Sequence, residues 1–265
     1  MMITAETVKS LRDKTGAGMM DCKRALTEAG GDMEKAIEVL RKHGMAKAEK
    51  KSGRATNQGK IAAAVRGNAA AMVEVLCETD FAADTDKFKE LVSAVLEAAL
   101  KAEGEGCVTE QVAEACKALL TEKIATIGEN MQIRRAVKWN CSAKAESYIH
   151  GGGRVGVLVE VANEDDAAFI HSVCLHVAAF NPTYICSADV PAEKIASERE
   201  IAAAQVVGKP APMIEKIVNG KINKWYTEVC LVNQPWITDD KTCIAKMKPN
   251  AKIVRFARWE VGEEL

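Results

Sequence analysis

Three short helical patterns of apolar residues fill the start of the chain. Two breaks that contain glycine, "TGAGMMD" (15–21) and "GGD" (30–32), separate them. Thr4 and Asp32 stand where they would cap the first and the third helix. Helices this short bury little surface, so we expect residues 1–43 to form a compact three-helix docking module.

The apolar periodicity stops over residues 41–60. One acid, Glu49, stands there against seven basic residues: Arg41, Lys42, Lys47, Lys50, Lys51, Arg54 and Lys60. A charge run without periodicity is typical of a solvated segment, and we expect a basic linker over residues 44–59. The other interpretation is a basic arm that touches RNA or an acidic partner.

Strand patterns follow the basic run. "IAAAV" and "AAMVEVL" flank "RGN" (66–68), which predicts a tight hairpin. Two amphipathic helices are predicted next, one opened by residues 86–88 and one over 110–127 that ends at Gly128. "MQIRRAVKW" (131–139) then alternates like a strand.

The same order of elements then returns. The tripeptide Val-Glu-Val occurs at 73–75 and at 159–161. At one fixed offset four identities occur, namely Asn130 with Asn250, Ile133 with Ile253, Arg135 with Arg255, and Trp139 with Trp259. We therefore expect an α+β fold with two similar core subdomains, residues 60–140 and 141–265, each with a small antiparallel sheet and helices on one face.

An insertion interrupts the second half. A helix is predicted from Pro191 to about Val207, "GKPAP" (208–212) reverses the chain, and a second helix is predicted from Met213 to Tyr226. We expect an antiparallel helical hairpin over residues 191–227. The pattern leaves open whether the hairpin projects or lies flat on the body.

Composition limits the compartment and the partners. Of 265 residues, 48% are hydrophobic, and the formal net charge is −1, without the basic excess of a nucleic-acid-binding domain. Nine cysteines, an odd number that never forms C-x-x-C, argue against a disulfide framework and a thiolate metal cluster. No signal-peptide pattern and no apolar run of about 18 residues are present. We expect a cytoplasmic protein that binds neither a membrane nor nucleic acid directly.

Motifs of small-molecule chemistry are missing from the sequence. Neither a phosphate-binding P-loop nor a dinucleotide-binding G-x-G-x-x-G occurs. "GGGR" (151–154) either cradles an anion or forms a tight turn before a strand, and we expect the turn. His171 and His176, five apart on one predicted helix, lie about 140° apart around it, too far for a shared metal. We expect no catalytic residue, no metal and no cofactor.

One aromatic residue lacks a counterpart in the repeat. After "CETD" (77–80) the first half has Phe81, whereas the second half has "NEDDAA" (163–168), without an aromatic. Residues of a shared core tend to be matched between repeats. Phe81 is therefore either core filling of the first half alone or a side chain presented to another molecule.

Four long stretches closely resemble the family of bacterial translation elongation factors Ts. They are "LRDKTGAGMMDCKRALTEAGGDMEKAIEVLRK" (11–42), "ETDFAA" (78–83), "IGENMQIRR" (127–135) and "YIHGGGRVGVLVEV" (148–161). The resemblance implies an N-terminal module similar to a ubiquitin-associated domain, a core of two subdomains and a helical-hairpin coiled coil. It also implies a guanine nucleotide exchange factor that binds the GTPase elongation factor Tu, displaces Mg²⁺ and promotes release of GDP for exchange with GTP. Many members continue past "EVGE" (260–263) into a further helical module, whose partner contacts we expect this chain to lack.

Site residues follow from the same resemblance. The family's Thr-Asp-Phe-Val stretch, which enters the GTPase near its Mg²⁺ site, matches Thr79, Asp80, Phe81 and Ala82, with alanine in place of the usual valine. The module is expected to dock through Met19 and Met20, whose side chains adapt to irregular surfaces. His150 matches a family position near the partner.

The sequence leaves two other function classes open. One is an adaptor that binds RNA or a ubiquitin-like surface through residues 1–60. The other is a metal- or thiol-dependent enzyme.

Overall fold

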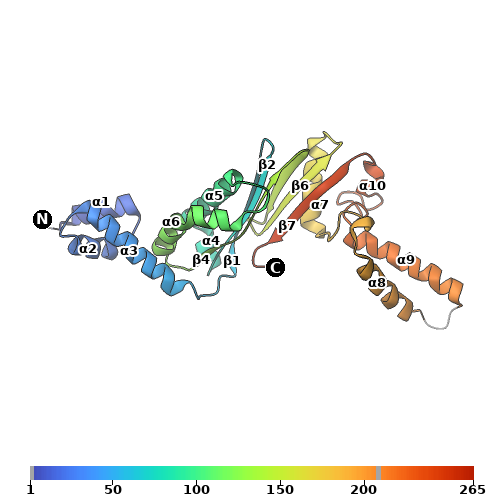
Figure 1. The fold of residues 1–265 in the computed structure, drawn as a ribbon, viewed down its shortest axis with the longest axis horizontal. Coiled ribbons are helices and arrows are strands. Elements are labelled where there is room, and N and C mark those ends of the chain that lie inside the picture. Colours follow the sequence, from blue (N-terminus) through green and yellow to red (C-terminus); the bar gives the residue numbers. More distant parts are fainter. Residues whose placement is uncertain (1–2, 207–209) are drawn as a thin grey trace. The chain divides into compact units, whose positions relative to one another are not determined.

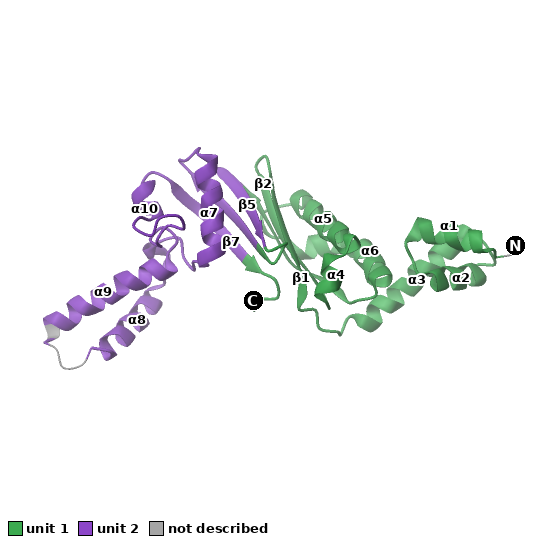
Figure 2. Cartoon of the chain, turned by 180° about the vertical axis from the view of Figure 1, so that it is seen from behind, with its two compact units in different colours: residues 1–140, 151–155, 259–265 green, residues 141–150, 156–258 purple. Residues whose placement is uncertain are grey.

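The computed structural model describes residues 3–206 and 210–265 of the chain. They form two compact units, which Figure 2 shows in green and purple. The first unit holds the residues up to 140 together with 151–155 and 259–265, and the second holds 141–150 and 156–258. Each unit carries one small sheet and its helices, most of which are labelled in Figure 1. The predicted α+β fold is confirmed.

The first unit opens with the predicted helices, α1 (Ala5–Thr15), α2 (Met19–Glu28) and α3 (Met33–Lys51). The Oγ1 atom of Thr4 accepts the backbone N–H of Thr7, and Asp32 caps α3. Six buried side chains make a small separate core: Val8, Leu11, Cys22, Ala25, Leu26 and Ala36. The capping residues thus act where the sequence indicated.

Helix α3 is longer than its sequence pattern indicated. It continues to Lys51, so residues 44–51 are helical and do not form the linker that was predicted over 44–59. Gly44 is buried, and a Cβ atom there would lie 3.4 Å from the Cβ of Ala125. Ala48, one turn later, packs on the core of the same unit. Small residues at i and i+4 make this contact, and a search for large apolar residues overlooks such a stripe.

The first sheet has the strand order β1-β2-β4-β3. Its strands are β1 (Gln58–Arg66), β2 (Ala69–Cys77), β3 (Gly106–Cys107) and β4 (Met131–Asn140). Strands β1 and β2 pair antiparallel with Arg66 opposite Ala69, which confirms the tight hairpin. Strand β2 pairs with β1 and β4 on its two edges and is buried along almost its whole length.

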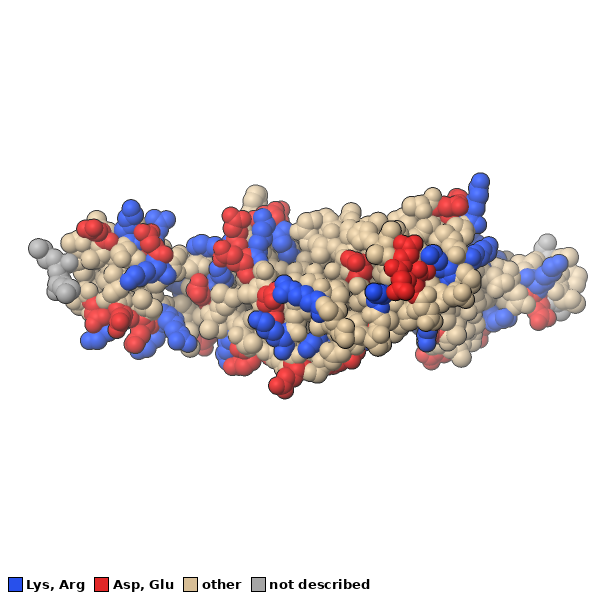
Figure 3. Space-filling view, turned by 90° about the horizontal axis from the view of Figure 1, so that it is seen from above, with Lys and Arg blue, Asp and Glu red and all other residues tan. Residues whose placement is uncertain are grey.

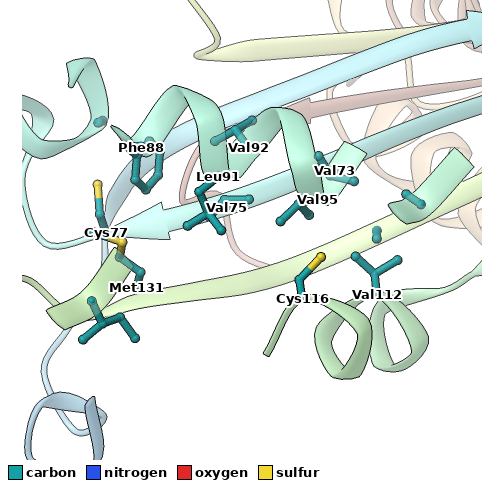
Figure 4. Packing of buried hydrophobic residues seen from close by; sticks show 14 of the residues in the cluster. Val73, Val75, Cys77, Phe88, Leu91, Val92, Val95, Val112, Cys116 and Met131 are labelled. Carbon is teal, nitrogen blue, oxygen red and sulfur yellow. The ribbon is translucent and has the colours of Figure 1, made fainter. Parts of the chain in front are cut away.

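Three helices complete the first unit: α4 (Asp80–Asp84), α5 (Asp86–Lys101) and α6 (Thr109–Ile127). Figure 4 shows Phe88, Leu91 and Val95 of α5 beside the β2 side chains of Val73 and Val75. Figure 4 also shows Val112, Cys116 and Met131, contributed to the same cluster by α6 and β4. The short helix α4 was not predicted, because five residues are too few to show a helical period.

A network of charged side chains involves strands β2 and β4 of the first sheet. Glu74 of β2 is fully buried, and its carboxylate accepts from Arg135 Nε at 2.5 Å and from Arg134 Nη1 at 3.2 Å. The backbone N–H of Gly262 donates to the same carboxylate at 2.8 Å. Arg135 also stacks over the Trp259 ring, 4.3 Å from its centroid. The chain's last residues are thereby held against the first sheet.

The second unit repeats the plan of the first. Its sheet has the order β5-β6-β7, with β5 (Lys144–His150), β6 (Val155–Ala162) and β7 (Lys252–Glu260), and α7 (Ala167–Phe180) packs beside β5. Glu160 of β6 is buried and accepts from Arg255 Nε of β7 at 2.6 Å. This pair is the counterpart of Glu74 and Arg135, so the repeat inferred from the sequence reappears in three dimensions.

Helices α8 (Ala192–Ala204) and α9 (Ala211–Val229) form the inserted hairpin, and the short elements η1 (Ser187–Asp189) and α10 (Ile244–Met247) flank it. Ala202 packs against Val218 and Ile222, so the two helices share a small core of their own. Helix α8 ends at Ala204, earlier than predicted; Val207 and the first two residues of "GKPAP" lie outside the described residues.

The glycines at 151–153 form the turn that the sequence favoured. All three have φ angles in the left-handed region, between +59° and +103°. The carbonyl of Gly153 accepts the backbone N–H of Ile61 at 2.7 Å, and that of Gly152 accepts Lys60 Nζ at 2.7 Å. A Cβ atom at Gly153 would lie 3.2 Å from the Lys60 side chain. Glycine is needed here for backbone shape and close approach.

Candidate functional site

Phe81 lies on the surface of the first unit, on the first turn of α4. Its side chain is 84% exposed, whereas Phe88, seven residues later, is fully buried. An exposed phenylalanine leaves a large apolar ring in water, which is unfavourable by roughly 1.5–3 kcal/mol relative to burial. Of the two interpretations drawn from the sequence, core filling is wrong and presentation to the outside agrees with the structure.

The next two residues anchor the helix that carries Phe81. Ala82 and Ala83 are 5% and 4% exposed and belong to the core of the first unit. Ala82 therefore lies beneath the turn and does not extend the exposed apolar surface. At the far end of α4, Asp84 Oδ1 lies 2.9 Å from Lys60 Nζ, and this hydrogen bond lowers the pKa of the Asp84 carboxyl.

Thr79 caps α4 and is itself held from outside the helix. Its Oγ1 atom accepts the backbone N–H of Ala82 at 3.2 Å and donates its proton to Glu129 Oε1 at 2.7 Å. The backbone N–H of Thr79 donates to the other oxygen, Glu129 Oε2, at 3.0 Å. Asp80 is exposed, and its Oδ1 atom accepts the N–H of Phe81 at 2.9 Å. Thr79 and Asp80 thus shape the turn, and of the four residues 79–82 Phe81 is the one that offers apolar surface.

The thiol beside the turn is not a reactive group. Burial, reinforced by the nearby Glu129 carboxylate, raises the pKa of Cys77 to about 12. Its Sγ atom donates to the carbonyl of Thr79 at 3.1 Å. A protonated, buried thiol is a poor nucleophile and a poor metal ligand. Cys77 therefore contributes a further hydrogen bond to the turn.

The other predicted contact residues lie on separate elements. Met19 and Met20 open α2 and are 44% and 73% exposed. His150 ends β5 in the second unit, exposed, with Nδ1 3.0 Å from the Tyr148 hydroxyl. The structure places all three at the surface, and their role stays a prediction.

The remaining histidines do not converge on a metal site. His176 is buried, whereas His171 is exposed and lies 3.9 Å from Glu146. Across residues 3–206 and 210–265, no group of three His, Cys, Asp or Glu side chains could hold a metal ion. None of the helices in that part of the chain is long and apolar enough to cross a membrane.

Most of the basic run has partners within the chain. Lys47 pairs with Asp21, Lys51 donates to the carbonyl of Gly128, Arg54 pairs with Glu78, and Lys60 pairs with Asp84. On the face shown in Figure 3, acidic and basic side chains are interspersed. These contacts disfavour a basic arm that is free to follow an RNA backbone.

Comparison with known proteins decides the family. The family model described as Elongation factor TS matches residues 78–263, which is more than half of the chain and begins one residue before Thr79. The chain belongs to the elongation factor Ts family.

Individual members of the elongation factor Ts family align over nearly the whole chain. The protein of Trichlorobacter lovleyi is 43% identical over 294 residues, covering 100% of this chain and 94% of its own length. That of Methylococcus capsulatus is 46% identical over 276 residues, covering 99% and 93%. That of Clostridium perfringens is 42% identical over 285 residues, covering 99% and 94%. Each is named Elongation factor Ts.

Reasoning from the sequence missed one residue of this site in the elongation factor Ts chain. Glu129 is separated from Thr79 by fifty positions, and nothing in the pattern links them. Two signals were available: its place directly after Gly128, the left-handed C-cap of α6, and its position inside the stretch "IGENMQIRR" (127–135). A polar residue that leaves a helix end often bonds to a neighbouring segment, but its partner is known only from the fold.

Proposed function

We propose that this protein is a guanine nucleotide exchange factor for the GTPase elongation factor Tu, acting in translation elongation. The observation that carries the proposal is the 84% exposed Phe81, set on a turn whose next two residues, Ala82 and Ala83, are buried in the core. Membership of the elongation factor Ts family supports it. The protein acts on a partner protein and has no reaction of its own on a small molecule. Its place of work is the cytoplasm, where translation occurs.

Phe81 acts as a wedge near the Mg²⁺ site of the GTPase. Mg²⁺ bridges the nucleotide phosphates and neutralises their charge, so displacing it weakens nucleotide binding. Burying Phe81 in the partner supplies about 1.5–3 kcal/mol. A release rate raised by about 10³-fold needs a barrier lowered by about 4 kcal/mol. Further contacts must therefore contribute.

Docking contacts supply the rest of the free energy that lowers the barrier to nucleotide release. Met19 and Met20 expose flexible apolar side chains on the N-terminal module, and His150 presents an imidazole from the second unit. By thermodynamic linkage, a factor that binds the nucleotide-free GTPase more tightly is released when nucleotide rebinds. The N-terminal module and His150 hold the factor in place while the wedge acts.

Nucleotide release from the cognate GTPase tests the proposal. The purified GTPase is loaded with fluorescent GDP and mixed with excess unlabelled nucleotide, with and without this protein. We expect release to accelerate by orders of magnitude, and the acceleration to saturate with protein concentration. Release at the intrinsic rate in both mixtures would overturn the proposed function.

A further inference from the structure

Two loops of the first unit are joined by reciprocal hydrogen bonds next to Phe81. The Glu129 carboxylate accepts the backbone N–H of Thr79 at 3.0 Å and its hydroxyl at 2.7 Å. In return the Glu78 carboxylate accepts the backbone N–H of Asn130 at 2.6 Å. Each segment thus binds the other's backbone through a charged acceptor, which is the stronger class of hydrogen bond.

Hydrogen bonds of the neighbouring residues hold the backbone on both sides of Glu129 in place. Gly128, just before it, closes α6 in the left-handed conformation, with its N–H donating to the carbonyl of Ile124 at 3.0 Å. Lys51, at the end of α3, donates to the carbonyl of Gly128. On the other side the Asn130 side chain donates to the carbonyl of Arg54 at 2.8 Å. The loop that carries Glu129 is tied down on both sides.

The helix that carries Phe81 depends on such support. Five residues are too few for a helix to persist by itself, because nucleation is unfavourable. The cap made by Thr79 requires the hydroxyl lone pair to face the N–H of Ala82, and donation of the hydroxyl proton to Glu129 fixes that orientation. The exposed ring of Phe81 therefore takes its direction from the backbone of α4.

We propose that Glu129 is a positioning residue for Phe81: it orients the Thr79 cap, and through that cap it holds the aromatic ring in the direction in which it enters the partner. The inference rests on the proposed exchange function. It assigns to Glu129 an effect on the rate of nucleotide release and not on the affinity of docking, since Met19, Met20 and His150 lie on other elements.

The test compares side-chain replacements at both ends of this contact. Glu129→Gln keeps the size of the side chain but removes its charge and one of the two carboxylate oxygens that accept from Thr79. Thr79→Val removes the hydroxyl, and Thr79→Ser retains it. Glu90→Gln is the matched control, because the Glu90 carboxylate pairs with Lys123 at 2.8 Å elsewhere in the same unit. Each variant is also made in the Phe81→Ala background.

We expect Glu129→Gln and Thr79→Val to slow stimulated GDP release by about tenfold at saturating factor, with an unchanged concentration for half-saturation. Glu90→Gln retains the wild-type rate, and Thr79→Ser, which keeps the hydroxyl, restores most of the rate that Thr79→Val loses. In the Phe81→Ala background Glu129→Gln has no further effect on the rate, because there is no ring left to position. Backbone amides of residues 80–84 exchange hydrogen faster in Glu129→Gln than in the wild type.

Three results would overturn the inference. The first is a wild-type rate in Glu129→Gln. The second is an equal loss of rate with and without Phe81, which would show that Glu129 acts by another route. The third is a wild-type rate in Phe81→Ala, which would remove the role that Glu129 is said to support. The exchange function itself fails separately, when the wild-type protein does not accelerate release.

Discussion

At the scale of single residues, the burial of two neighbouring alanines explains why the side chain of Phe81 is exposed. Ala82 and Ala83 turn inward to the core, so a helical turn of this length must point the residue before them outward. Phe88, on the inner face of α5, is buried instead. The two phenylalanines differ in exposure because of backbone direction, which composition and hydropathy do not reveal.

The buried Glu74 gives the first prediction at this scale. Glu74→Ala would remove the carboxylate that pairs with Arg134 and would leave Arg135 paired with Glu263. Removing one partner of a buried pair destabilises by about 3–5 kcal/mol, because the other charge stays desolvated. Urea unfolding followed by circular dichroism measures the loss. In the control Glu114→Ala, which breaks an exposed pair with Lys117, the change should stay below about 0.5 kcal/mol.

His176 predicts a pH dependence of stability. It is fully buried between Phe180 and Trp236, with ring centroids 4.7 and 5.1 Å away, and Nε2 lies 3.0 Å from Gln234 Oε1. Its Nδ1 atom has no hydrogen-bond partner among the described residues. Burial lowers the pKa of the imidazole below its ordinary value of 6.5. The folded state therefore holds His176 neutral.

The direction of the effect follows from linkage. Well above pH 6.5 the ring is neutral in both states and has no pH-dependent effect. As the pH falls below 6.5, His176 is protonated in the unfolded state but stays neutral in the folded state. The free energy of unfolding therefore decreases by up to about 1.4 kcal/mol per pH unit. Unfolding curves between pH 7.5 and about pH 5 should show this slope in the wild type. His176→Phe should flatten it; an equal slope in the wild type and in His176→Phe would contradict the assignment.

Sequence reasoning identified the exposed apolar residue of the site but not the group that holds it. The lack of an aromatic in the second half of the repeat made Phe81 a candidate for presentation. Thr79 and Asp80 were adjacent and could be judged together with it. Glu129 could not, because the contact between residues 79 and 129 exists only after β2 and α6 have packed in the same unit.

At the scale of elements, capping residues were the most reliable signals. Thr4 and Asp32 start helices where expected, and Gly128 ends α6. The elements that the sequence did not predict correctly lie in segments where the apolar periodicity carries no information. The end of α3 is stabilised by small residues and helix formers rather than by a large apolar stripe. Helix α4 is too short for any period.

Substitutions at two mid-helix glycines distinguish the effect of packing on stability from the effect of helix propensity. A Cβ atom added at Gly44 of α3 would lie only 3.4 Å from the Cβ of Ala125 in α6, whereas Gly220 of α9 has open space around it. Gly44→Leu should destabilise the first unit by about 1–3 kcal/mol through overpacking, although leucine is the better helix former. Gly220→Leu should leave stability unchanged or raise it. Thermal unfolding of both variants decides, and an increase for Gly44→Leu would contradict the packing of α3 on α6.

At the scale of the whole molecule, the two units share a plan and differ at the site. The pairs Glu74 with Arg135 and Glu160 with Arg255 occupy equivalent strands of the two sheets. After β2 the chain forms α4 with Phe81, whereas after β6 it forms a loop in which Glu164 and Asp166 pair with Lys248. The repeated parts therefore build the scaffold, and the unrepeated turn carries the proposed function.

The most direct test of that function replaces Phe81 alone. Phe81→Ala should fold like the wild type, since the ring is 84% exposed, and should still bind the GTPase through its other contacts. Losing about 1.5–3 kcal/mol of wedge burial predicts a stimulated GDP release slower by roughly 10- to 100-fold. Phe180→Ala, which shortens a phenylalanine that is 45% exposed in the second unit, serves as the control and should exchange at the wild-type rate. A wild-type release rate for folded, GTPase-bound Phe81→Ala would contradict the account.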